Sequence, residues 1–320
     1  MKNISIGKLR GLQQCTSGRG TFTCLALDHR QNLRRALNPA DPASVSDEAL
    51  SRFKLDVTAM LADLSTAVLL DPEFSAAQAI GSEALPGRIA LVVAVESTGY
   101  GGSSTARQGQ ILPGWSVEKA KRMGASMVKL LVYYHPDSPT AHETEGFVRQ
   151  VAGECTRSDL GLMLEPLSYS LDANKKLSSA EKRHVVVETA RRLVIPGVDV
   201  LKAEFPIDIA EDSDESTWAE ACAEISASSP APWIVLSAAL NFDTYLRQVE
   251  IACKAGASGC AVGRAVWQEA VDMDGQARLA FLVTTGRERL SRLNALCSEL
   301  GNPINNFYSA EAPFEWYKTY

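Results

Sequence analysis

The sequence predicts a single α/β domain built as a (β/α)8 barrel of the TIM type. Two observations carry this prediction. Eight short apolar runs alternate with amphipathic stretches along the 320 residues. The runs are continuously apolar, which is typical of parallel strands buried on both faces. An open, doubly wound sheet is the competing architecture. No G-x-G-x-x-G motif follows the first run, which counts against its dinucleotide-binding form.

The predicted strands are rich in β-branched residues, and most end in polar ones. In chain order they are Thr21–Leu27, Thr66–Asp71, Ile89–Val95, Ser126–Tyr133, Gly161–Glu165, Asp199–Glu204, Trp233–Ser237 and Ser258–Val262.

The stretches between these strands have the periodicity of helices with one apolar face. The clearest is Ala43–Leu64, because Leu50, Phe53, Val57 and Leu61 fall on or near one face. The other predicted helices are Val117–Met123, His142–Cys155, Glu181–Val194, Glu215–Ile225, Phe242–Ala255 and Gly275–Leu300.

Two segments exceed what a minimal barrel needs. Ser97–Gly114 is rich in glycine and serine and follows the third strand, and the polar Pro166–Ala180 follows the fifth. We expect both loops on the carboxyl-terminal face of the barrel, where catalytic loops lie. The single domain spans 1–320, with a barrel core of about 20–300 and an aromatic-rich tail over 301–320. That tail is expected to strap the barrel or to form a dimer contact, so a homo-oligomer is one expectation.

Composition excludes several classes of protein. With 46% hydrophobic and 22% charged residues, the chain is neither disordered nor a small disulfide-stapled protein. A net charge of −6 argues against nucleic acid as a partner. No apolar run reaches the roughly 18 residues of a membrane span, and the start lacks the apolar segment of a secretory signal. The seven cysteines form no C-x-x-C pair, so we expect reduced thiols in the core or at the surface, and a cytoplasmic location.

Two lysines inside apolar strands are the sharpest chemical signal. Lys129 lies in Met-Val-Lys-Leu-Leu-Val, and Lys202 lies in Val-Leu-Lys-Ala-Glu-Phe-Pro. Burial and a second cation nearby both lower the pKa of an amine, and a neutral amine attacks a carbonyl to form a Schiff base. The alternative is a structural ion pair, for example of Lys202 with Glu204 or Glu165.

Carboxylates at strand ends extend this hypothesis. Glu165 emerges from an apolar strand, where a raised pKa suits a proton shuttle. Its alternative is a salt bridge to a lysine across the barrel mouth. Asp28 follows the first strand and is expected to orient a lysine or hold a substrate hydroxyl, unless it caps the helix that begins near His29.

The last two strands predict an anion site. Ser237 ends the seventh strand, and Gly263-Arg264 opens the helix after the eighth, which is the usual phosphate position in such barrels. A surface salt bridge is the alternative for Arg264. Arg30 is expected to bind a second anion at strand one, and Arg34 and Arg35 to face solvent.

Nothing in the sequence predicts a metal or another cofactor. The four histidines do not cluster by spacing, so a two-histidine metal site is unsupported. Carboxylates remain able to bind magnesium, and a metal-dependent barrel lyase or isomerase using Glu96, Glu165 and Glu204 stays open as an alternative.

Six motifs, in order, resemble the class I tagatose 1,6-bisphosphate aldolases, and the aldolases of sulfofructose 1-phosphate share many of them. The resemblance covers roughly residues 20–300. The motifs are Leu-Ala-Leu-Asp-His-Arg (25–30), Val-Lys-Leu-Leu-Val-Tyr-Tyr (128–134), Leu-Glu-Pro-Leu-Ser-Tyr (164–169), Asp-Val-Leu-Lys-Ala-Glu-Phe-Pro (199–206), Val-Leu-Ser-Ala (235–238) and Val-Gly-Arg-Ala-Val-Trp (262–267).

The resemblance implies a metal-free Schiff-base aldolase on a (β/α)8 barrel, acting on a small sugar phosphate. It places the imine-forming lysine on Lys202, the second lysine on Lys129 and the acid/base glutamate on Glu165. The aspartate after strand one falls on Asp28. The phosphate-binding residues fall on Ser237, Gly263 and Arg264.

Departures from the family bear on the substrate. His29 stands where the family usually has glutamine, and we expect it at the distal end of the substrate. Ala239 replaces a usual glycine after Ser237. Thr98-Gly99-Tyr100, Tyr133-Tyr134 and the long last helix favour tagatose 1,6-bisphosphate, whereas Glu165-Pro166 favours sulfofructose 1-phosphate as the second candidate. Because of the two departures, a catalytically idle sugar-phosphate-binding regulator remains a further alternative.

Overall fold

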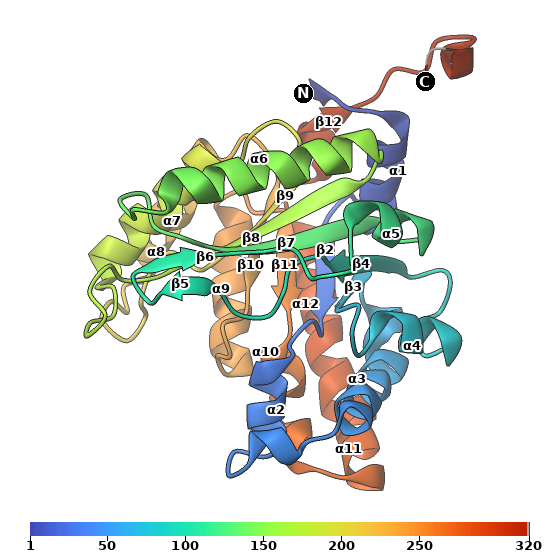
Figure 1. Cartoon of the computed structure of the whole chain (residues 1–320), viewed down its shortest axis with the longest axis vertical. Helices are drawn as coiled ribbons and strands as arrows, with labels where there is room; N and C mark the ends of the chain where they lie inside the picture. The colour runs from blue at the N-terminus through green and yellow to red at the C-terminus, as the bar shows by residue number, and fades with distance from the viewer. Residues whose placement is uncertain (319) are drawn as a thin grey trace.

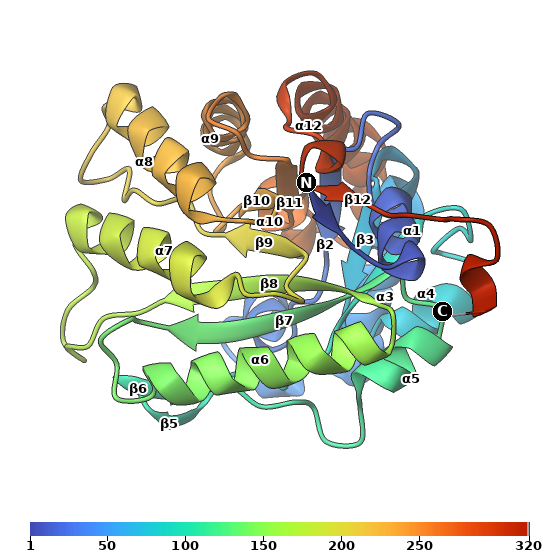
Figure 2. The same ribbon diagram turned by 90° about the horizontal axis from the view of Figure 1, so that it is seen from above.

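The computed structural model describes residues 1–318 and 320, and a closed barrel of parallel strands forms its centre (Figures 1 and 2). The strands pair in chain order, and the last pairs with the first to close the barrel. The predicted fold class is thereby confirmed. The barrel strands are β2 (Phe22–Ala26), β3 (Ala67–Leu70), β4 (Ala90–Ala94), β7 (Met127–Tyr134), β8 (Gly161–Ser168), β9 (Val200–Ala203), β10 (Trp233–Leu236) and β11 (Gly259–Val262).

Strand β8 is longer than its apolar run indicates. It continues beyond Glu165 because β7 runs beside it, with pairing up to Tyr134 and Ser168. The loop predicted from Pro166 therefore begins three residues later, at Tyr169.

Helices surround the barrel and pack their apolar sides on the strands. Ser46 caps α3 by accepting a hydrogen bond from the Ala49 amide, and Ser178 and Glu181 form a capping box on α7. The helices are α1 (Ile6–Gln14), α2 (Gln31–Leu37), α3 (Asp47–Leu61), α4 (Ala76–Gly81), α5 (Val117–Arg122), α6 (Ala141–Arg157), α7 (Ser179–Leu193), α8 (Glu215–Ser228), α9 (Phe242–Lys254), α10 (Arg264–Trp267), α11 (Gly275–Phe281) and α12 (Arg287–Leu300).

Two predicted helices differ in detail. The predicted Ala43–Leu64 is α3 flanked by 3₁₀ turns at Pro42–Ser44 and Ala62–Leu64. The predicted Gly275–Leu300 is interrupted by a π-helical turn at Leu282–Gly286, which separates α11 from α12.

The loop after β4 contains a hairpin that the sequence did not predict. Strands β5 (Gly101–Ser103) and β6 (Ala106–Gln108) pair antiparallel. Gly102 has φ +80°, and a Cβ there would lie 2.3 Å from the Ala106 carbonyl oxygen, so only glycine fits. Figure 2 shows the hairpin beside the end of β7, on the carboxyl-terminal side of the barrel.

The two ends of the chain meet on the opposite side. Strand β1 (Lys2–Asn3) pairs with β12 (Tyr308–Ser309), and Figure 1 shows both termini together at the top. Residues 311–318 and Tyr320 of the tail are exposed, and the Tyr320 hydroxyl accepts a hydrogen bond from the Gly7 amide at 3.1 Å. The tail thus lies away from the carboxyl-terminal face, and its role in self-association stays a prediction.

All seven cysteines are buried and form no disulfide. The prediction of reduced thiols in the core is confirmed, and the alternative of thiols at the surface is wrong. Within the part of the chain that the structure describes, no helix is both long and apolar enough to cross a bilayer.

Candidate active site

A pocket of about 640 Å³ lies at the carboxyl-terminal end of the barrel. Strand ends and the loops that follow them form its wall, as the barrel architecture requires. All the residues predicted to act in catalysis or in substrate binding line it: Asp28, His29, Arg30, Lys129, Glu165, Lys202, Ser237, Gly263 and Arg264.

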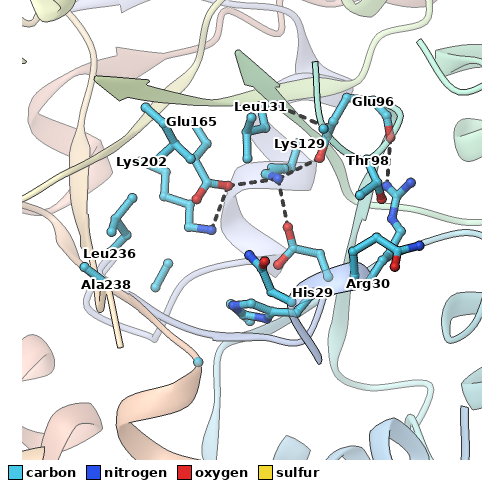
Figure 3. A pocket seen from close by; sticks show the side chains of 18 of the residues that line it. His29, Arg30, Glu96, Thr98, Lys129, Leu131, Glu165, Lys202, Leu236 and Ala238 are labelled. Atoms are coloured by element: carbon cyan, nitrogen blue, oxygen red, sulfur yellow. Dashed lines mark hydrogen bonds and ion pairs between the residues drawn. The ribbon is translucent and has the colours of Figure 1, made fainter. Parts of the chain in front are cut away.

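Lys129 is surrounded by three carboxylates. Its Nζ lies 2.8 Å from Asp28 Oδ2, 2.7 Å from Glu96 Oε1 and 2.9 Å from Glu165 Oε2, and its side chain is 1% exposed (Figure 3). Burial lowers the pKa of Lys129, but the three carboxylates together raise it well above its ordinary value. The expectation of a lowered pKa is therefore wrong for Lys129, whose charged form the three carboxylates favour.

Lys202 contacts one carboxylate instead of three. Strand β9 brings its Nζ to 2.9 Å from Glu165 Oε2, the same oxygen that contacts Lys129. Glu204, the other partner considered, is not within ion-pair distance of Lys202 among the described residues. Lys202 thus borders the cavity with a single ionic contact.

Glu165 lies between the two lysines. Burial raises its pKa, but Lys129 and Lys202 outweigh burial and lower the pKa below its ordinary value. The expected raised pKa is therefore wrong for the free protein. As a carboxylate 2.9 Å from each ammonium, Glu165 is placed to accept a proton from Lys202.

Asp28 is a partner of Lys129 and not a helix cap. Helix α2 begins at Gln31 and has no side-chain cap, so the capping alternative is wrong. Burial raises the pKa of Asp28, but Lys129 and Lys202 hold it well below its usual range.

Glu96 belongs to this cluster, although it was predicted to act only in the metal-dependent alternative. It also accepts a hydrogen bond from the Leu131 amide at 3.1 Å. The available signal was its place at the end of the third predicted strand.

Ser237, Gly263 and Arg264 converge at the ends of β10 and β11. Ser237 Oγ accepts a hydrogen bond from the Gly263 amide at 3.3 Å. A Cβ on Gly263 would lie 3.0 Å from both the Ala26 carbonyl oxygen and His29 Cε1, which explains glycine there. Arg264 Nε is buried without a hydrogen-bond partner among the described residues, so it retains capacity for a ligand.

His29 lies on this side of the pocket. Its ring meets Trp267 edge-on, with centroids 5.3 Å apart, and packs against Gly263. His29 thus lies beside the predicted anion site at Gly263, and its expected place at the distal end of the substrate stays a prediction. Burial is the main cause that lowers the pKa of His29 to about 4, so the imidazole is neutral at pH 7.

Arg30 is engaged by the protein. Its Nη1 lies 2.6 Å from Glu73 Oε2 and its Nη2 donates to the Glu96 carbonyl at 2.7 Å, with 4% of the side chain exposed. These bonds fix the loop after β4. The second anion site on Arg30 stays a prediction, and it is less favoured because both terminal amino groups already contact acceptors of the protein.

The residues described contain no group of three or more histidine, cysteine, aspartate and glutamate side chains arranged for a metal. Glu96 and Glu165 bind Lys129, whereas Glu204 accepts a hydrogen bond from the Ser168 amide at 2.6 Å. Two of the three glutamates of the metal-dependent alternative therefore share Lys129 as their cation, and the third has a different partner.

Comparisons with known proteins identify the family of this chain. The family model described as DeoC/LacD family aldolase matches residues 22–269. Tagatose 1,6-diphosphate aldolase 1 of Enterococcus faecalis is 31% identical, over 93% of this chain and 97% of its own length. The Listeria monocytogenes tagatose 1,6-diphosphate aldolase is 28% identical, over 93% of this chain and 94% of its own length.

Solved structures share the fold. Fructose-bisphosphate aldolase from Plasmodium falciparum aligns over 94% of this chain and 98% of its own, with a TM-score of 0.71 at 13% identity. A Schiff-base-forming fructose 1,6-bisphosphate aldolase aligns over 92% of this chain and 99% of its own, with a TM-score of 0.57 at 20% identity.

Proposed function

The chain belongs to the DeoC/LacD family of aldolases, and from this premise we propose that it is a Schiff-base aldolase of a ketose 1,6-bisphosphate. The proposed substrate is D-tagatose 1,6-bisphosphate, because relatives with that name match over most of this chain. The products are dihydroxyacetone phosphate and glyceraldehyde 3-phosphate. The observation that carries the proposal is Glu165 Oε2, placed 2.9 Å from the amines of both Lys202 and Lys129.

The reaction begins with a proton transfer. Lys202 gives a proton to Glu165 and becomes a neutral amine, while Lys129 remains charged because three carboxylates surround it. The amine attacks the C2 carbonyl of the open-chain sugar to form a carbinolamine. Protonated Glu165 then donates its proton to the carbinolamine hydroxyl, which leaves as water, and the iminium forms.

Cleavage uses Glu165 as a base. The carboxylate removes the proton of the C4 hydroxyl, the C3–C4 bond breaks, and its electron pair moves into the iminium to give an enamine. The aldehyde half leaves as glyceraldehyde 3-phosphate. Reprotonation at C3 and hydrolysis of the imine release dihydroxyacetone phosphate and restore Lys202.

The C1 phosphate is assigned to the site at β10 and β11. The Ser237 hydroxyl, whose oxygen accepts a hydrogen bond from the Gly263 amide, and the Arg264 guanidinium supply donors there. Arg264 Nε and His29 Nδ1, both buried without a hydrogen-bond partner among the described residues, add polar capacity on the same side. This position leaves C2 beside β9, which carries Lys202.

Borohydride trapping tests the proposal. Protein incubated with dihydroxyacetone phosphate and borohydride should gain a reduced adduct, which peptide mass spectrometry should map to Lys202. The Lys202→Met variant should give no adduct and no cleavage. An adduct on another lysine, or none in the wild type, would overturn the assignment.

A substrate panel tests the choice of sugar. We expect faster cleavage of tagatose 1,6-bisphosphate than of sulfofructose 1-phosphate, with fructose 1,6-bisphosphate as the stereochemical comparison. Activity should persist in EDTA, because Lys129 supplies the cation beside Glu96 and Glu165. Binding without turnover of any sugar would favour the regulatory alternative instead.

A further inference from the structure

The distal end of the substrate needs a site that the residues above do not provide. With the C1 phosphate at β10 and β11 and C2 at Lys202, the carbons beyond C4 point across the pocket. The wall on that side carries Thr98, Tyr100, Leu131 and Tyr133. Arg30, the cation expected there, is bonded to Glu73 and Glu96.

A second arginine lies immediately behind this wall. Arg107 is on β6 of the hairpin, and its guanidinium carbon is 4.5 Å from the ring centre of Tyr100 and 5.1 Å from that of Tyr133. A third ring, Tyr169, lies 4.7 Å away. Tyr100 and Tyr133 themselves line the pocket, so the cation is one side chain removed from the cavity.

The charge of Arg107 has no carboxylate partner. Among the described residues, its only side-chain hydrogen bond runs from Nε to the Ser104 carbonyl at 2.9 Å, and no ion pair forms. By contrast, Arg30 and Arg34 each have an acidic partner. A guanidinium held by aromatic faces with its terminal amino groups unpaired is suited to an external anion.

Tyr133 lies between Lys129 and Arg107. It lies on β7 four residues after Lys129, on the same inward face of the strand. Burial raises the pKa of Tyr133 despite the opposing charges of Arg107 and Lys129. Its hydroxyl therefore keeps its proton at pH 7 and can donate it to an acceptor.

The hairpin that carries Arg107 is fastened to the body of the protein. Thr140 Oγ1 donates to the Arg107 carbonyl at 3.1 Å, and Gln108 Nε2 donates to Glu143 at 2.5 Å. The guanidinium is thus held in place before any ligand binds, which limits the entropy lost on binding.

We propose that Arg107, together with the hydroxyls of Tyr100 and Tyr133, binds the phosphate at the distal end of the substrate. This inference rests on the proposed function and deepens it, because it names the group that separates ketose bisphosphates from 1-monophosphates. Arg107 is then a specificity-determining residue and takes no part in bond cleavage.

The test compares two sugars that differ only in the distal phosphate. For Arg107→Met, KM for tagatose 1,6-bisphosphate should rise about 10-fold or more, which is the loss expected on removing a hydrogen bond between charged groups. Cleavage of tagatose 1-phosphate and trapping of dihydroxyacetone phosphate should match the wild type, since neither ligand has a distal anion.

Arg35→Met is the matched control. Arg35 also lines the pocket but is exposed on α2, where it donates to Asn32. Its variant should keep the bisphosphate KM. A rise for Arg35→Met without one for Arg107→Met would move the distal site to α2 and overturn the inference.

A purely structural role for Arg107 would give a different pattern. If the substitution only loosened the hairpin, cleavage of the bisphosphate and of the 1-phosphate would weaken by the same factor. That result would overturn the proposal. If Arg107→Met does not fold, Tyr133→Phe keeps the ring and removes the hydroxyl, and it should still raise KM selectively for the bisphosphate. A wild type that forms no adduct with dihydroxyacetone phosphate would instead contradict the proposed function.

Discussion

Lys129 and Lys202 are both buried in barrel strands, and the carboxylates around them distinguish their chemistry. Lys129 has three partners and stays charged, whereas Lys202 shares a single oxygen of Glu165. The sequence locates both lysines, but it does not determine how many carboxylates each contacts. That number depends on strands far apart in the chain that close into one barrel.

The carboxylates around Lys129 make the stability of the protein depend on pH. In the wild type, Lys129 and Lys202 lower the pKa of Glu165 and hold that of Asp28 well below its usual range. The unfolded chain then binds more protons, so this contribution to stability is present above about pH 4 and is lost as pH falls through the lowered values.

We expect Lys129→Met to reverse that slope. The variant leaves Asp28, Glu96 and Glu165 buried without their shared cation, and the free energy of unfolding should fall by about 3–5 kcal/mol at pH 7. Their pKa values should then exceed those of the unfolded chain, so stability should rise on acidification. Urea unfolding between about pH 4 and pH 7 measures this. A variant whose stability falls with acidification as steeply as the wild type would contradict it.

His29 provides a second titration. Its pKa of about 4, lowered mainly by burial, makes the ring neutral through the physiological range. The stability that depends on neutral His29 is complete above about pH 6.5 and declines as pH falls toward 4. The His29 signal in NMR should show no inflection between about pH 5 and pH 8, and the assignment from His29→Gln is the control. An inflection near 6.5 would show that the ring is solvated.

At the scale of elements, long periodic segments were predictable and short ones were not. The eight strands and the helices α3 and α5–α9 follow predicted runs, because their apolar faces pack on the barrel. Helices α1 and α4 escaped prediction because about two turns carry too little periodicity. The hairpin β5–β6 depends on a left-handed glycine and on contacts with α6.

The turn after β10 is an element held in a strained backbone. Ala238 has φ +43° and Ala239 has φ +61°, in the left-handed region that favours glycine. We expect Ala239→Gly to raise the free energy of unfolding by up to about 1 kcal/mol, since relief of strain exceeds the entropy that glycine adds to the unfolded chain. Thermal unfolding measures the difference. Ala223→Gly, on the exposed side of α8, is the matched control and should lower stability by about 1 kcal/mol. If both variants lowered the free energy of unfolding equally, the backbone at Ala239 would not be strained.

At the scale of the whole molecule, the two ends of the barrel differ in what they do. The carboxyl-terminal end holds the pocket, whereas the opposite end holds α1, the paired chain ends and a buried ion pair between Lys8 and Asp199 at 2.8 Å. Asp199 also accepts a hydrogen bond from the Leu162 amide at the start of β8. This pair therefore joins helix α1 to the barrel.

Lys8→Met should destabilise the protein without changing the reaction. It leaves Asp199 buried without a cation, so the free energy of unfolding should fall by about 3–5 kcal/mol. Because the pair lies away from the pocket, kcat and KM at 25 °C should stay within about two-fold of the wild type. Lys129→Met is the matched variant, since the same substitution at the other end should abolish activity as well as stability. A large change in KM for Lys8→Met would contradict this division between the ends.

The barrel, the order of its strands and the catalytic residues at its mouth are predictable from the sequence. These follow from local patterns: apolar runs make strands, and polar residues at their ends meet at one face because parallel strands share a direction. The charge state of Lys129, the side of the pocket on which His29 lies and the pairing of Arg30 with Glu73 emerge only in the folded barrel. It also placed Arg107 against three tyrosine rings. Ion pairs and ring contacts join residues that are distant in sequence, so no local pattern encodes them.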